Sequence, residues 1–257
     1  MVARVEDGQE EYEVIKVRKP EQIHQTKGEV NGGSFGMRVH FVFDSYLDPE
    51  YVHFGTLRVL NDETLSPGTV WPLHPHREIE MVTYCVAGEF RHADETGANG
   101  ILREGWAQHI TAGKGLFHSE INNLPDKPMR FVQMWFYPKT RGLEPSVEQK
   151  PFEREQRTNR LLPLASDEHP DALPIRAAAQ VYASCLEAGH TLEYALAAGH
   201  GVYLYLLEGG PLRVNDRELL ALGAVQVVDE PRLQITAQAD AELLLIDVLM
   251  VETPPSQ

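Results

Sequence analysis

The chain has 257 residues, of which 42% are hydrophobic, and this is enough to build one large or two small globular cores. Its formal net charge of -15 gives an average field that repels nucleic-acid phosphates and anionic lipids, so we expect no direct binding to nucleic acid or to a membrane. The first residues are acidic where a signal peptide has an apolar core, and no run approaches the roughly 18 apolar residues of a spanning helix, so we expect a cytoplasmic protein.

Short apolar or alternating runs follow one another between residues 35 and 137, among them MRVHFVF, MVTYCV and RFVQMWFY. Turn-rich pieces such as NDETLSPG, ETGANG and NLPDKP separate these runs. No run combines helical period with helical length, and short strands spaced by turns about every 8 to 12 residues are typical of a sandwich or barrel. The pattern predicts an all-β N-terminal domain over residues 1–138.

The character of the sequence changes at residues 139–171, which are polar, charged and punctuated by prolines, as linkers between domains tend to be. Strand-like runs such as GVYLYLLEGG, AVQVVDE and AELLLIDVLMV resume after this predicted linker, and Asn215-Asp216 is typical of a hairpin tip. We expect a second, smaller all-β domain over residues 172–257. The two cysteines, Cys85 and Cys185, lie in apolar runs, which favours buried free thiols in a reducing compartment.

A first pair of potential metal ligands lies in the run LHPHREIEMVTYCV. His74 and His76 are two apart on an expected strand, so both imidazoles face the same side with backbones about 6.6 Å apart. The pair alone is weak, because 11 histidines in 257 residues give about half of one His-x-His pair by chance.

A second pair with the same spacing strengthens the prediction. In GKGLFHSEIN, His118 and Glu120 would also share one face of a strand. Three imidazoles and one carboxylate suit a divalent ion, with Fe(II) as first choice and Mn, Ni, Cu or Zn as alternatives, and they leave positions open for a substrate.

The run GTVWPLHPHREIEMVTYCVAG resembles the first cupin motif, and Gly115, His118 and Asn122 match the Gly-x-x-His-x-x-x-Asn core of the second. More narrowly, HPHREIEMVTYCVAGEFRHAD and ITAGKGLFHSE resemble the pirin and pirin-like proteins, as do GGSFG and LDPEYVHFGTLRVLND. The resemblance covers most of residues 32–137. It implies two tandem cupin barrels of the jelly-roll type, a bicupin, with a metal-free C-terminal barrel and a monomeric chain.

The resemblance also implies a ligand set. In pirin-like proteins two histidines of the first motif and the His and Glu of the second hold the metal, which carries over to His74, His76, His118 and Glu120.

One rival for the carboxylate position is Glu80, which matches the position of the carboxylate in many other cupins. By parity it shares a face with His74 and His76 if the strand is unbroken, although the resemblance favours Glu120. The remaining histidines, including His92 and His109, fit no ligand spacing, so we expect them to be surface or hydrogen-bonded residues.

Several pirin-like proteins are similar in activity to quercetin 2,3-dioxygenase, which opens the central ring of a flavonol with dioxygen. The resemblance therefore implies a metal-dependent dioxygenase that binds a flavonol or related aromatic enol and O2. A carboxylate at the ion can accept the proton of the enol, so we expect Glu120 to act as both ligand and general base. Two alternatives stay open. One is a regulatory protein that binds a protein partner and senses redox state through its metal, and the other is an enzyme of the same class with a different enediol or phenol as substrate.

Overall fold

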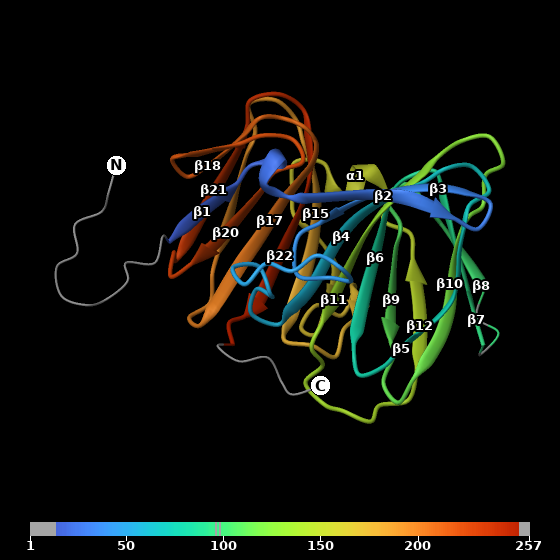
Figure 1. Ribbon diagram of the computed structural model, residues 1–257. Helices are drawn as coiled ribbons and strands as arrows, with labels where there is room; N and C mark the ends of the chain where they lie inside the picture. Colours follow the sequence, from blue (N-terminus) through green and yellow to red (C-terminus); the bar gives the residue numbers. More distant parts are fainter. Residues whose placement is uncertain (1–13, 96, 98, 252–257) are drawn as a thin grey trace.

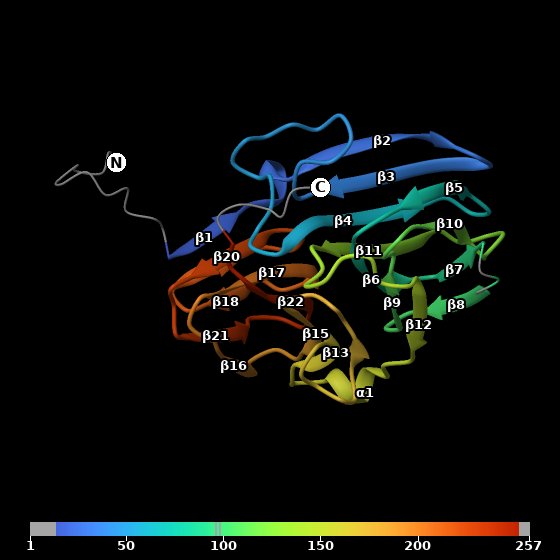
Figure 2. The same cartoon turned by 90° about the horizontal axis from the view of Figure 1, so that it is seen from below.

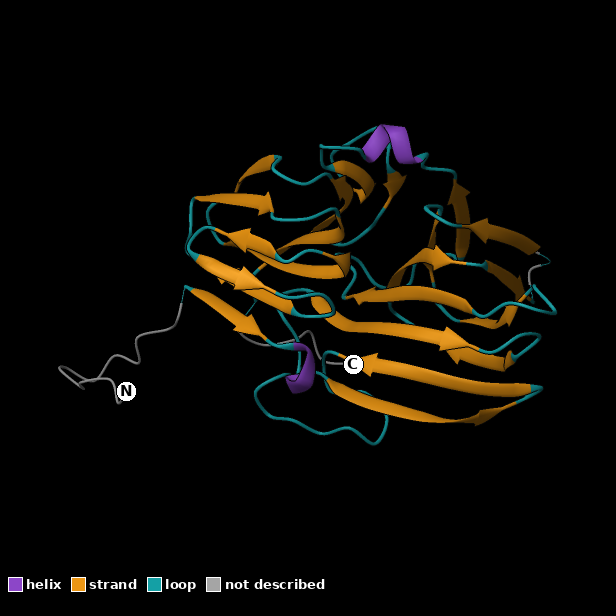
Figure 3. Cartoon of the chain, turned by 90° about the horizontal axis from the view of Figure 1, so that it is seen from above, coloured by secondary structure: helices purple, strands orange, loops and turns teal. Residues whose placement is uncertain are grey.

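The computed structural model describes residues 14–95, 97 and 99–251, which fold almost entirely into β-strands (Figures 1 and 3). Four sheets contain the 22 strands of this described part. Its helical segments are a 3-10 turn at Pro20–Gln22 and the one-turn helix α1 at Arg154–Arg157. Neither is long enough to cross a membrane, and no other described segment forms a spanning helix.

The N-terminal barrel consists of a seven-stranded and a four-stranded sheet. The larger sheet has the order β12-β9-β6-β11-β4-β3-β2, with bounds β2 His24–Val30, β3 Gly33–Val39, β4 Leu57–Leu65, β6 Glu80–Ala87, β9 Ala107–Thr111, β11 Met129–Phe136 and β12 Ser146–Lys150. The smaller has the order β5-β10-β7-β8, with bounds β5 Val70–His76, β7 Glu89–Asp94, β8 Asn99–Arg103 and β10 Leu116–Asn122. Buried side chains from both sheets, such as Leu65, Phe90 and Phe131, close the barrel.

The C-terminal barrel repeats this design. Its larger sheet has the order β1-β20-β17-β22-β15-β13-β14, with bounds β1 Ile15–Arg18, β13 Leu162–Ser166, β14 Leu173–Pro174, β15 Ala179–Leu186, β17 His200–Gly209, β20 Ala224–Val228 and β22 Ala241–Leu249. Its smaller sheet has the order β16-β21-β18-β19, with bounds β16 Thr191–Ala195, β18 Leu212–Val214, β19 Arg217–Leu219 and β21 Arg232–Ala237. Asn215 has a φ of +49° in the turn between β18 and β19, which confirms the predicted hairpin tip.

The two seven-stranded sheets pack against each other through one shared hydrophobic core (Figure 2). On β17, Tyr203 and Tyr205 face this shared core, while Leu204 and Leu206 face the interior of the C-terminal barrel. Burial on both faces explains why the C-terminal strands read as continuous apolar runs rather than alternating ones. On β11 the same alternation places Met134 in the shared core, so the residues on either side of it face the interior of the N-terminal barrel.

The segment 139–171, predicted as a linker, contributes strands to both barrels. Its strand β12 pairs with β9 in the N-terminal sheet, and its strand β13 pairs with β15 in the C-terminal sheet. Conversely, β1 lies within the predicted N-terminal domain but pairs with β20 (Figure 1). Strand β12 is polar because it lies at a sheet edge, where few of its side chains need to be apolar. Strand β13 is apolar but only five residues long, and the polar residues around it concealed it.

Two further sequence predictions, on the cysteines and on the piece NDETLSPG, can be compared with the structure. Both cysteines are free and buried, which confirms that prediction. The piece NDETLSPG is not a turn throughout, because β4 extends to Leu65. Asp62 and Glu63 make it look polar, but both side chains are buried with partners: Arg130 forms an ion pair with Asp62, and Trp71 donates a hydrogen bond to Glu63.

Candidate metal centre

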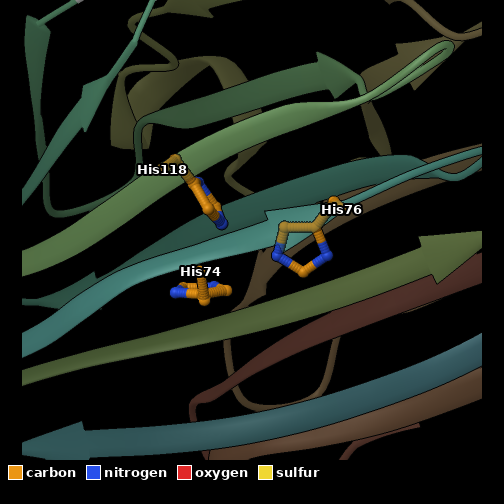
Figure 4. Close-up of side chains that lie close together, drawn as sticks. All are labelled: His74, His76 and His118. Atoms are coloured by element: carbon orange, nitrogen blue, oxygen red, sulfur yellow. The ribbon is translucent and has the colours of Figure 1, made fainter.

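Three histidines converge inside the N-terminal barrel (Figure 4). His74 and His76 come from β5 and His118 from β10, and one ring nitrogen of each lies within 4.8 Å of the others. Their ring centroids are 4.5 to 4.9 Å apart. The spacing predicted from sequence therefore brings these three side chains together.

The local strand geometry accounts for this convergence. The strands β5 and β10 are antiparallel neighbours, and their register places His118 directly opposite His74. His76 lies two residues further along β5 and so projects from the same face. His76 and His118 are buried and His74 is half-buried, so the site opens on the His74 side.

The free nitrogens of these imidazoles fit a divalent ion. The Nε2 atoms of His76 and His118 are buried and have no hydrogen-bond partner, which is costly unless something binds them. His74 Nδ1 donates to the carbonyl of Pro72 at 2.8 Å, which leaves its Nε2 as a lone-pair donor. Burial, with the neighbouring imidazoles, lowers the pKa of His76 to about 3 and that of His118 to about 2. Neutral imidazole is the form that binds metal.

The fourth predicted ligand, Glu120, lies on the same strand as His118 and lines one cavity with His74 and His76. Its carboxylate lies outside the 4.8 Å group of histidine nitrogens. A register shift between His118 and Glu120 displaces the strand at this point, and Gln133 donates a hydrogen bond to the carboxylate. Burial raises the pKa of Glu120 to about 7, against the opposing effect of Gln133.

The rival carboxylate, Glu80, is directed elsewhere. The strand is broken between His76 and Glu80, because β5 ends at His76, Glu78 has a φ of +52°, and β6 begins in the other sheet. Glu80 Oε2 instead faces His109 Nε2 at 2.7 Å and accepts hydrogen bonds from Thr111 at 3.1 Å and from the Arg176 amide at 3.0 Å. The condition under which Glu80 would share a face with His74 and His76, an unbroken strand, is therefore not met.

A partner of the site that sequence spacing missed is His92 on β7. Its Nε2 lies 2.7 Å from Asp94 Oδ2, and its Nδ1 lies 3.4 Å from His118 Nδ1. If His92 donates to Asp94, its Nδ1 can accept from His118, which keeps the lone pair of His118 on Nε2. His92 is fully buried and hydrogen-bonded, as expected, but one of its partners is His118 of the histidine cluster.

We predict that His92→Ala weakens metal binding about 10- to 100-fold, because removing the partner that orients a ligating histidine has an effect of this size. Chelator competition with a coloured indicator would measure the affinity, and far-UV circular dichroism would verify the fold. His109→Ala is the matched control, since His109 is equally buried but bonds to Glu80. Equal loss of affinity in both variants would show that burial, and not contact with His118, matters.

An apolar cavity of about 470 Å³ is lined by two of the three histidines, His74 and His76. Its walls include the aromatic and aliphatic side chains Phe35, Met37, Val39, Phe43, Trp71 and Trp135. We call it the apolar cavity below. Its size is within the range of about 300 to 1,000 Å³ that is typical of small-molecule sites.

The apolar cavity also contains Glu63, a second acidic residue that the sequence placed in a turn. Glu63 accepts a hydrogen bond from Trp71 Nε1 at 3.0 Å. Burial and the charge of Glu120 raise the pKa of Glu63 well above its usual value. The inward position of Glu63 could have been predicted only by recognising β4 as a strand with alternating faces.

Known proteins share this architecture over both halves of the chain. The sequence model of the pirin family matches residues 21–136, and the model of the quercetinase C-terminal cupin domain matches residues 162–248. These matches, together with the two barrels, confirm the predicted bicupin fold.

Individual relatives cover nearly the full length. A Pseudomonas aeruginosa protein whose name gives quercetin 2,3-dioxygenase as a provisional activity is 41% identical over 223 residues, 86% of this chain and 95% of that protein. A quercetin 2,3-dioxygenase of Escherichia coli is 28% identical over 222 residues, with the same two coverages. The structure of a bacterial pirin from Escherichia coli in complex with nickel(II) has a TM-score of 0.84 at 26% identity, covering 92% of this chain and 100% of that one.

Proposed function

This chain belongs to the pirin family, and from this premise we propose that it is a metal-dependent dioxygenase of the quercetin 2,3-dioxygenase type. The observation that carries the proposal is the pair of buried, unpartnered Nε2 atoms of His76 and His118, in a histidine cluster of which His74 and His76 line an apolar cavity. The names of the relatives from Pseudomonas aeruginosa and Escherichia coli support the reaction class.

In this proposal His74, His76 and His118 hold one divalent ion, and Glu120 completes the ligand set. When bound, such an ion supplies Lewis acidity that lowers the pKa of an enolic hydroxyl and holds the resulting anion close to dioxygen. The histidines fix the position of the ion through Nε2. Glu120 accepts the proton of the enolic hydroxyl, with Gln133 orienting the carboxylate by its hydrogen bond.

The apolar cavity supports an enzyme over a sensor. A site that only reports redox state to a protein partner needs no internal cavity. A cavity of about 470 Å³ with mostly apolar walls can receive an aromatic ring system and exclude water. Trp135 packs edge-on against His76 with centroids 4.8 Å apart and donates to Gln133 at 2.6 Å, so one wall of the cavity is fixed to the site.

Iron(II) stays our first choice of metal, although the related pirin structure contains nickel(II) and imidazole accepts several ions. We also propose a monomer in the cytoplasm, and the buried free thiols Cys85 and Cys185 support a reducing compartment.

The test is to measure metal content by mass spectrometry and oxygen consumption with quercetin on one preparation. We expect about one ion per chain and one O2 consumed per quercetin. Protein that holds no metal and takes up none of Fe, Mn, Ni, Cu or Zn would contradict the metal site. Loaded protein that binds its ion but consumes no oxygen with quercetin or related enols would favour the regulatory alternative.

A further inference from the structure

A second cavity, larger than the first at about 1020 Å³, also reaches the metal centre. His74, His76 and Trp135 line both cavities, so the centre lies where the two meet. The two differ in their charged residues. The described residues that line the apolar cavity include acidic side chains but no arginine or lysine. The second cavity is lined by Arg58, Arg77 and Arg141. We call this second space the arginine cavity.

This concentration of positive charge is unusual for the chain. The whole sequence has 38 acidic residues against 23 basic ones, yet the arginine cavity has three arginines against one acidic residue, Glu78. The carboxylate of Glu78 already accepts hydrogen bonds from the Gly142 amide, at 3.1 and 3.2 Å from its two oxygens. Its role is therefore to hold the turn that follows Arg141.

Two of these guanidinium groups, those of Arg58 and Arg77, have no acidic partner among the described residues. Arg58 Nη1 donates to the carbonyls of Val42 and Val52, which are neutral acceptors. Arg77 follows directly after His76, is exposed, and has neither a hydrogen bond nor an ion pair with any described residue. A guanidinium at the rim of a low-dielectric cleft attracts an anion, and its planar fork matches a carboxylate.

We propose that the arginine cavity binds a carboxylate group of the substrate, so that the physiological substrate is a phenolic or enolic acid. Its reacting hydroxyl lies at the metal centre, and the ring that bears the carboxylate extends into the arginine cavity, where Arg58 and Arg77 hold the acid group. Any further ring of the substrate lies in the apolar cavity. Arg141 lines the same cavity and adds to its positive charge. The inference rests on the proposed function, and quercetin, which has no carboxylate, would be only a partial mimic of this substrate.

The experiment compares an anionic probe with its neutral methyl ester. Titration calorimetry on the nickel(II)-loaded full chain would measure the affinity for 3,4-dihydroxybenzoate and for its methyl ester. Both offer the same two hydroxyls, but only the acid has an anionic group. We expect the acid to bind about tenfold tighter, the size of one charge-assisted hydrogen bond.

Variants then locate the source of this preference. Arg77→Gln should reduce the ratio of the two affinities below about threefold, and it changes an exposed side chain that has no hydrogen bond or ion pair with a described residue. Arg58→Gln should do the same, although circular dichroism must verify the loop that Arg58 contacts. Arg213→Gln is the matched control, because it removes an exposed arginine on β18 of the other barrel and should preserve the ratio.

The outcomes separate this inference from the proposed function. Equal affinity for acid and ester in the unmodified chain, or a preference that survives in both arginine variants, overturns the arginine cavity as a carboxylate site. Oxygen consumption with quercetin, measured on the same preparation, tests the dioxygenase separately. Turnover without a preference for the acid defeats only the inference, and a preference for the acid without turnover of any enol defeats only the proposed reaction.

Discussion

His74→Ala should weaken metal binding by more than about a hundredfold and reduce quercetin turnover in proportion. Replacing even an outer partner of a ligand costs 10- to 100-fold, so loss of a direct ligand must cost more. His74 is the suitable member of the three because it is half-buried, so its removal disturbs packing least. Metal content after dialysis, followed by chelator competition, measures the effect.

The matched control for this variant is His190→Ala. His190 is exposed in the other barrel, so the same change of residue type should leave metal content and turnover as they are. A His74→Ala protein that retains a full equivalent of metal after dialysis would show that His74 is not a ligand. The buried, unpartnered Nε2 atoms of His76 and His118 would then need an explanation other than a metal ion.

Glu120→Gln should separate binding from catalysis. The amide retains an oxygen that can face the ion but cannot accept a proton, so we expect most of the metal to stay bound while kcat falls about 10²- to 10⁴-fold. Anaerobic addition of quercetin followed by oxygen pulses would show whether substrate still binds when turnover is lost. Full activity of Glu120→Gln would refute its role as base.

Two further carboxylates serve as comparisons for Glu120. Glu148→Gln, an exposed change on β12, should alter neither metal content nor kcat. Glu80→Gln should leave metal affinity intact but destabilise the fold, since Glu80 bonds to Thr111 and to the Arg176 amide. If the Glu80→Gln protein lost its metal while its folding stability stayed unchanged, Glu80 would have to be counted as a ligand.

The three-histidine site could be predicted from sequence because it depends on strand alternation. A spacing of two within one strand fixes a shared face, and the pairing of β5 with β10 then needs only the correct partner to bring His118 opposite His74. The resemblance to a family supplied that partner. The same rule could not decide on Glu80, because the positive φ of Glu78 interrupts the strand and no local sequence signal marks that residue.

The other misses have a common physical cause. His92, Glu63 and strand β12 all owe their positions to pairing between segments distant in sequence, and single-strand patterns contain no information on such pairing. Buried polar residues are especially misleading because their partners remove the cost of burial only in the folded chain. Composition alone could not separate them from surface residues.

The shared core between the two seven-stranded sheets makes the barrels thermodynamically inseparable. Neither can open without exposing Tyr203, Leu244 and their neighbours on both sides, so the chain should melt in a single transition. Linkage then extends to the metal: an ion at a hundred times its Kd adds about 2.7 kcal/mol to the stability of the whole molecule. The melting temperature of the C-terminal barrel therefore reports occupancy of a site that lies entirely in the other half.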